Sequence, residues 1–136
     1  MDRPVRWFLR SAVVWLGIGM AFGITMGVSP GYVGILRTPH LHALLPGFVL
    51  MMIFGVAYHV LPRFAGKMVP WRAGPMVHVV LANVGLLLLV SGLLLRLRWP
   101  AVGQLLIPGG GILVMAGAAL FIHTVWHLTG LPMWRS

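Results

Sequence analysis

The sequence predicts an all-α fold, a four-helix transmembrane bundle, and two observations carry that prediction. The 136 residues are 60% hydrophobic and only 8% charged, whereas soluble domains carry roughly a quarter charged residues. A chain of this size cannot bury so much apolar surface in water. The second observation is that four stretches have the apolar length of about 20 residues that crosses a bilayer. They cover residues 7–28, 40–61, 74–95 and 101–128, and we expect residues 1–136 to form a single integral membrane domain.

The joints between these stretches contain residues that end helices. Ser29-Pro30-Gly31 follows the first stretch, Pro62 lies at the end of the second, and Trp99-Pro100 precedes the fourth. Arginines precede the first stretch, but it is too long for the apolar core of a signal peptide and has no convincing cleavage site. We therefore interpret it as an uncleaved helix.

Glycine and proline predict two further features inside the helices. Gly19, Gly23 and Gly27 recur every four residues in the first stretch, which allows close contact with another helix. That helix could belong to the same bundle or to a partner, and the sequence favours neither. In the fourth stretch, Pro108 and the three glycines after it predict a kink or an unwound turn.

Basic residues predict the orientation. Seven of the ten lie on one side of the predicted membrane, and cytoplasmic segments carry the excess of Lys and Arg. We therefore expect a multi-pass protein of the cytoplasmic (inner) membrane with both termini in the cytoplasm. The seven are Arg3, Arg6, Arg10, Arg63, Lys67, Arg72 and Arg135, and the other three are Arg37, Arg96 and Arg98.

The charged and sulfur-containing residues exclude several classes of chemistry. Asp2 is the only acidic residue and there is no cysteine, which excludes catalysis by paired carboxylates, carboxylate sites for magnesium or calcium, disulfides and thiolate ligands. The formal charge of +9 is interpreted as a means of orientation and of contact with the lipid bilayer, not of nucleic-acid binding. Six histidines and nine methionines remain, and these suit heme iron and copper.

Depth sorts the histidines into two groups. His40 and His42 open the second predicted helix, and His59 follows His42 by 17 residues, roughly 25 Å along a helix, so one metal cannot use both ends. The second group lies near the predicted cytoplasmic ends of the helices. Its members His123 and His127 are four residues apart, so they share a helix face and could bind one metal together. The alternative is that these imidazoles bond backbone carbonyls or lipid headgroups. The weaker metal candidates are His59, His78, His123 and His127.

The pair His40 and His42 is the stronger candidate site. Two residues apart on a helix, their side chains diverge by about 200° and should face different neighbours. Pro46 lacks the N–H that would bond the His42 carbonyl, which loosens the nearby turns. Loosened carbonyls could fix the second ring nitrogen of a ligating histidine. The alternative is a pair of helix-start residues wetted at the membrane surface.

The segment from His40 to Gly66 has the pattern His-x-His-x4-Gly-Phe-x6-Gly-x6-Pro-x3-Gly. It resembles the second-helix region of NnrS-type membrane proteins, which contain heme and copper and are linked to nitric-oxide metabolism. It is also similar to subunit I of the heme–copper oxidases and nitric-oxide reductases, especially the cbb-type branch. The match covers about 27 residues and depends mainly on the His-x-His sequence. The matching residues are His40, His42, Gly47, Phe48, Gly55, Pro62 and Gly66.

The resemblance implies heme b with an axial imidazole from His42 or His40, with copper as a second metal to consider. Subunits of that family have twelve spans in three arcs of four, so a homotrimer of this four-span chain would reproduce their architecture. The copper-site histidines and the crosslinked tyrosine of the family have no counterpart here. We therefore expect no complete oxidase or nitric-oxide reductase active site.

Three functions remain open at this stage. The first is a heme b protein for electron transfer, for sensing nitric oxide or oxygen, or for heme and copper handling beside a respiratory oxidase or nitric-oxide reductase. The second is a heme-free copper or zinc protein that uses the cytoplasmic-end histidines. The third is a cofactor-free assembly subunit of a respiratory complex, docked through the glycines of its first helix.

Overall fold

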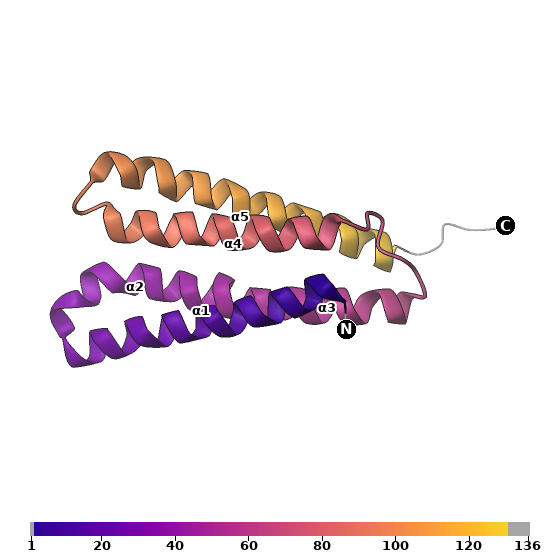
Figure 1. The fold of residues 1–136 in the computed structure, drawn as a ribbon, viewed down its shortest axis with the longest axis horizontal. Coiled ribbons are helices and arrows are strands. Elements are labelled where there is room, and N and C mark those ends of the chain that lie inside the picture. The colour runs from indigo at the N-terminus through magenta and orange to yellow at the C-terminus, as the bar shows by residue number, and fades with distance from the viewer. Residues whose placement is uncertain (1, 131–136) are drawn as a thin grey trace.

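The computed structural model describes residues 2–130, which form four long helices joined by short connections (Figure 1). The second long helix is continuous from Pro30 to Ala65 but consists of four segments that differ in their hydrogen bonding. The elements in order are α1 (Arg3–Val28), η1 (Pro30–Tyr32), α2 (Val33–His42), η2 (Ala43–Leu50), α3 (Met51–Ala65), α4 (Gly74–Leu95) and α5 (Pro100–Thr129).

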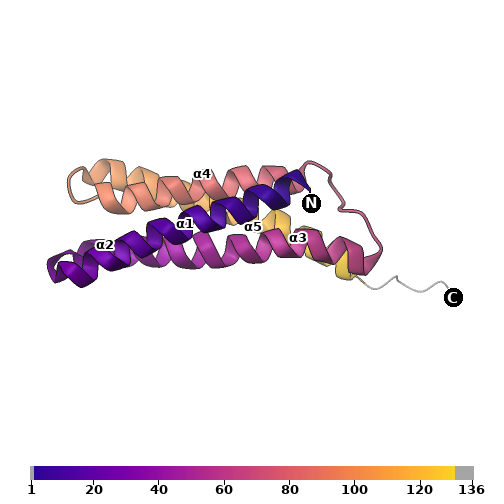
Figure 2. The ribbon, with the colours of Figure 1, turned by 60° about the horizontal axis from the view of Figure 1, so that its bottom comes forward.

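The helices form two antiparallel hairpins that pack side by side (Figures 1 and 2). One hairpin joins α1 to the second long helix, and the other joins α4 to α5 along their whole lengths. Helix α4 contacts both α1 and α2, and α5 contacts α3. The start of α1 and the end of α5 therefore lie at the same end of the bundle, as a chain with four crossings requires.

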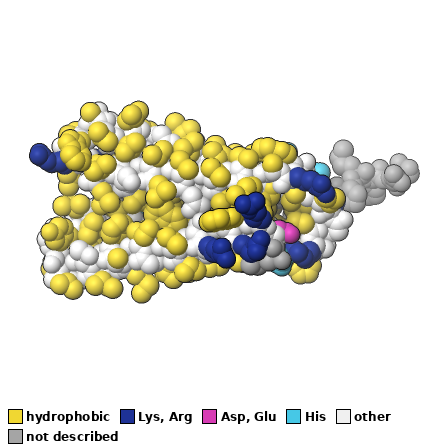
Figure 3. All heavy atoms as spheres, viewed as in Figure 1, with side chains coloured by type: hydrophobic (Ala, Val, Ile, Leu, Met, Phe, Trp, Pro, Cys, Tyr) yellow, Lys and Arg dark blue, Asp and Glu magenta, His cyan; other side chains and the backbone are white. Residues whose placement is uncertain are grey.

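The prediction of an all-α four-helix bundle with four membrane-length helices is confirmed. Lys and Arg side chains lie toward the two ends of the molecule, and the surface between them is largely hydrophobic (Figure 3). Only 11% of the most apolar window of α5 is buried inside the bundle. Lipid or another copy must cover the rest, because apolar surface of this extent is unfavourable in water. The end with Arg3, Arg6, Arg10, Arg63, Lys67 and Arg72 is called the basic end below.

The second helix begins ten residues earlier than predicted, so the expected start at residue 40 is wrong. Pro39 does not end the helix but lies buried inside α2. In lipid, a broken helix would leave backbone groups without partners, so a helix continues through proline more readily than in water. His40 therefore lies roughly 15 Å from Pro30, at 1.5 Å per residue, and is not a helix-start residue.

Pro46 changes the local helix type, in line with the loosening expected from the sequence. The eight residues Ala43–Leu50 form a π-helix, and Pro46 lies inside it. A π-helix bonds residues five apart instead of four, so it is wider and can accommodate the missing N–H of proline. The two histidines immediately precede this segment.

Helix α5 is helical from Pro100 to Thr129, so of the kink or unwound turn predicted at Pro108 the unwound turn does not occur. Three glycines follow Pro108, and the middle one, Gly110, lies directly on the backbone of Gly85 and Leu89 in α4. Tight packing against a partner helix holds the chain helical where proline alone would weaken it.

Candidate functional site

The ring of His40 lies in a notch on α1. Its Nδ1 is 2.8 Å from the carbonyl oxygen of Gly19, and a methyl group on Gly23 would lie 3.1 Å from its Cε1. A side chain at Gly19 would collide with Leu44. These two glycines therefore serve packing inside the bundle, whereas Gly27 has open space around it. The sequence did not decide whether these glycines contact a helix of the same chain or of a partner, and for Gly19 and Gly23 the contact is within the same chain.

His42 is held by its own helix. Its Nδ1 is 2.9 Å from the carbonyl oxygen of Thr38, one turn earlier. As expected, His40 and His42 face different neighbours, and both are half-buried. A carbonyl oxygen only accepts hydrogen bonds, so in a neutral imidazole the proton lies on Nδ1 of both rings, and Nε2 keeps its lone pair. Among the described residues, we find no hydrogen-bond partner for either Nε2.

His59 has the opposite arrangement. Nη1 of Arg63 lies 3.0 Å from Nδ1 of His59 and also bonds the His59 carbonyl. A guanidinium only donates, so Nδ1 of His59 accepts and the proton of the neutral ring lies on Nε2. In this conformation His59 has no free lone pair for a metal, unlike His40 and His42.

His78 is fully buried in α4. Its Nδ1 lies 3.2 Å from the hydroxyl of Tyr58, and its Nε2 is buried with no partner among the described residues. The ring also lines a small cavity of about 40 Å³ beside the π-helix segment, together with Met51 and Phe54. Gly117 of α5 makes room for it, because a methyl group there would lie 2.7 Å from Cδ2 of His78.

Three phenylalanines complete the surroundings of His78. The ring centroids of Phe54 and Phe8 lie 4.5 and 4.9 Å from that of His78, and the centroid of Phe121 lies 6.1 Å away. Sequence reasoning missed the Tyr58–His78 pair, because it depends on the relative rotation of two helices. The one available signal was that both residues fall near the same end of neighbouring spans.

His123 and His127 are exposed on the outer face of α5. Within residues 2–130 of one chain, no group of three or more His, Cys, Asp or Glu side chains is placed to hold one metal ion. A single copy of the chain therefore does not gather His59, His78, His123 and His127 at one point. Metal binding by any of them, alone or with a second molecule, stays a prediction.

Fold and site together define a multi-pass helical membrane protein whose second helix presents two carbonyl-anchored imidazoles. Comparison with protein-family models, with curated proteins and with solved structures finds no match to the chain.

Proposed function

We propose that this chain is a heme b-binding membrane protein in which Nε2 of His42, of His40 or of both is an axial ligand. The observation that carries the proposal is the hydrogen bonding of these two rings. Each Nδ1 is anchored to a backbone carbonyl, at 2.8 Å for His40 and 2.9 Å for His42. Metal-ligating histidines almost always donate their second ring N–H in this way, which fixes the tautomer and the orientation of the ring.

The cost of burying imidazole supports the same reading. A polar nitrogen in hydrocarbon is unfavourable unless it finds a partner. Nδ1 of each ring has its partner in the carbonyl of Gly19 or Thr38, and Nε2 keeps a lone pair. Coordination to iron would satisfy that nitrogen, so the donor set fits heme b.

The two rings point to different neighbours, so one chain would not place both on the same iron. We infer that the heme site is completed by a second copy of the chain, most simply in a homotrimer that brings the spans to twelve. The excess of basic residues at the basic end supports an inner-membrane location with both termini in the cytoplasm. A respiratory oxidase or nitric-oxide reductase is the partner that the resemblance favours.

When bound, heme supplies one-electron chemistry and a site for small gases. The chain contributes the geometry. If two imidazoles are bound, the iron is six-coordinate and the protein relays electrons, whereas a single imidazole leaves a position for nitric oxide or oxygen. The choice between electron transfer, gas sensing and heme or copper handling depends on how many imidazoles bind the iron.

An absorption spectrum of the full chain purified from heme-replete cells tests the proposal. We expect a Soret band, and separate α and β bands after reduction. These bands should be weaker in His42→Ala or His40→Ala and absent in the double variant. His59→Gln is the matched control, because Arg63 already occupies the lone pair of His59, and it should retain the spectrum.

Two results would contradict the proposal. One is a protein without a Soret band that stays unchanged on adding hemin, and the other is a full heme spectrum in the double variant. Copper or zinc retained by heme-free protein, and lost on replacing His123 and His127, would favour the heme-free alternative.

A further inference from the structure

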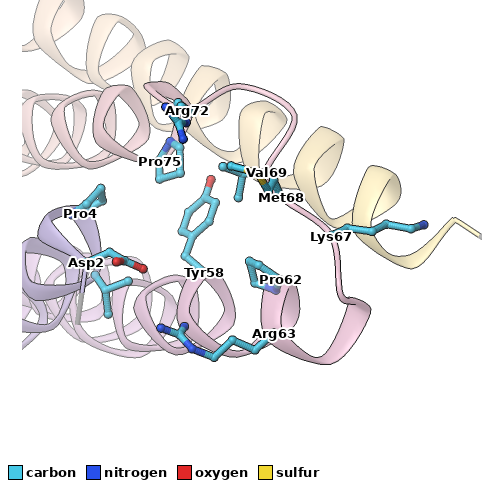
Figure 4. Close-up of a pocket in the computed structure, with 11 residues that line it drawn as sticks. Asp2, Pro4, Tyr58, Pro62, Arg63, Lys67, Met68, Val69, Arg72 and Pro75 are labelled. Carbon is cyan, nitrogen blue, oxygen red and sulfur yellow. The ribbon is translucent and has the colours of Figure 1, made fainter.

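A cavity of about 590 Å³ opens at the basic end of the bundle (Figure 4). It lies between the first turn of α1, the last turns of α3, the connection to α4 and the first turn of α4. Its volume falls in the range of about 300–1,000 Å³ that is typical of small-molecule sites. None of the residues in the proposed heme site lines it.

The polar groups of this cavity are mainly cationic. Arg72 lies at one wall and Arg63 at the opposite one, and the hydroxyl of Tyr58 points into the space between them (Figure 4). Lys67 contributes its stem, and its Nζ donates to the carbonyl of Gly130, 2.8 Å away. Asp2 is the single carboxylate. No ion pair between Asp2 and an arginine is found in the described part of the chain. Nη1 of Arg63 already bonds Nδ1 and the carbonyl of His59, so Arg63 offers its remaining N–H groups to an added anion, beside the guanidinium of Arg72.

The rest of the wall is apolar. It is lined by Pro4 and Val5 of α1, Pro62 of α3, Val69 of the connection and Pro75 of α4. A free inorganic anion would gain nothing from these surfaces, whereas a ligand with a charged head and an apolar body would contact both kinds of wall. The position at the end of membrane-length helices places the cavity at the level of lipid headgroups.

We propose that this cavity binds the phosphodiester headgroup of an anionic phospholipid. Arg63 and Arg72 contact the phosphate, the glycerol and upper acyl carbons lie against the prolines and valines, and headgroup hydroxyls donate to the carboxylate of Asp2. Basic pockets between membrane helices are known to hold lipid headgroups in this way. The site joins three of the four long helices, so a bound lipid would tie the two hairpins together.

Native mass spectrometry of the full chain tests the proposal. The protein is equilibrated in nanodiscs of phosphatidylglycerol and phosphatidylcholine in equal amounts and then released. We expect one phosphatidylglycerol to be retained in preference to phosphatidylcholine, and retention to fall about fivefold in Arg72→Gln or Arg63→Gln, as for one cationic contact. Arg10→Gln is the matched control, because it removes a charge from the same end without lining the cavity.

The test separates the occupants. Equal retention of both lipids, or equal retention by wild type, Arg72→Gln and Arg63→Gln, would overturn the proposal. Displacement of phosphatidylglycerol by millimolar inorganic phosphate would assign the cavity to a free anion and overturn the lipid assignment. Arg72 lies in an exposed connection, so its replacement should leave the fold intact. His42→Ala should not alter lipid retention, which keeps this test independent of the heme proposal.

Discussion

Gly23 and Gly27 lie one turn apart on α1, yet only Gly23 touches a neighbour. A methyl group on Gly23 would press on the imidazole of His40 at 3.1 Å, while one on Gly27 would meet nothing within 4 Å. The pair therefore separates the effect of a bulky residue on the helix surface from its effect on the histidine notch.

We predict that Gly23→Leu lowers the free energy of unfolding by about 1–3 kcal/mol, the usual cost of overpacking. It should also reduce heme content, because the ring of His40 must leave the carbonyl of Gly19. Gly27→Leu should be neutral or stabilising by up to about 1 kcal/mol, because leucine has the higher helix propensity. Thermal unfolding in detergent and the ratio of heme to protein measure both effects. Equal behaviour of the two variants would contradict the assigned packing.

The sequence ranks His40 and His42 above the other histidines by depth and spacing, but it does not predict which ring nitrogen of each keeps a lone pair. His40, His42 and His59 lie on one helix but have different hydrogen-bond partners. Nδ1 of His40 bonds the carbonyl of Gly19 and Nδ1 of His42 bonds that of Thr38, which leaves the lone pair on Nε2. Nδ1 of His59 accepts from Arg63, so its lone pair is used. The bond to Gly19 could not be predicted, because it depends on how α1 and α2 are rotated against each other. A carbonyl anchor is expected from the turns that Pro46 loosens, but the carbonyls that anchor the two rings belong to Gly19 and Thr38, whose backbone bonding Pro46 does not remove.

At the scale of the element, glycines on both helices let α4 and α5 pack closely, and Gly85 and Gly110 make the nearest backbone approach. Gly110 lies on the backbone of Gly85 and Leu89, whereas its neighbours Gly109 and Gly111 have open space. Small residues let two backbones approach closely, which is how helices associate in lipid.

We predict that Gly110→Ala lowers the free energy of unfolding by about 1–3 kcal/mol, because its methyl group meets backbone atoms that cannot rotate away. Gly109→Ala, one residue earlier, should be neutral or stabilising by up to about 1 kcal/mol through higher helix propensity. Denaturation in mixed micelles compares the two. A loss of stability in Gly109→Ala equal to that in Gly110→Ala would contradict the assigned interface.

Hydropathy predicted the four helices well, because the requirement to satisfy backbone groups in lipid leaves few other structures. Its main error is the start of the second helix, which is expected at residue 40 but lies at Pro30. Pro39 lies inside a helix and Pro108 does not unwind one, since neighbouring helices and the absence of water favour a continuous helix.

At the scale of the whole molecule, the bundle is thin and its long helices bury little of themselves. The buried share of the most apolar window is 44% for α4 but 22% or less for the other three long helices. Much of the outer surface is therefore available to other copies as well as to lipid.

We predict that the heme-loaded protein has the mass of three chains plus bound heme in native mass spectrometry. A homotrimer supplies three equivalent His40–His42 pairs around one axis, so rings that diverge within a chain can meet between chains. The heme-free double variant His40→Ala, His42→Ala should show less of the trimer, because it lacks the shared ligand. A heme-saturated monomer would refute this arrangement.

The π-helix segment Ala43–Leu50 determines how the two halves of the helix are rotated about its axis, as well as the local width. Each residue turns an α-helix by about 100°, and a π turn accommodates an extra residue without ending the helix. The segment therefore fixes the angular offset between the half of the helix with His40 and His42 and the half with Tyr58 and His59. A homologue one residue shorter here would turn its histidine pair by roughly a quarter of a circle, away from the notch on α1. A His-x-His match in another chain therefore implies the same site only if the distance to the following glycines and prolines is kept.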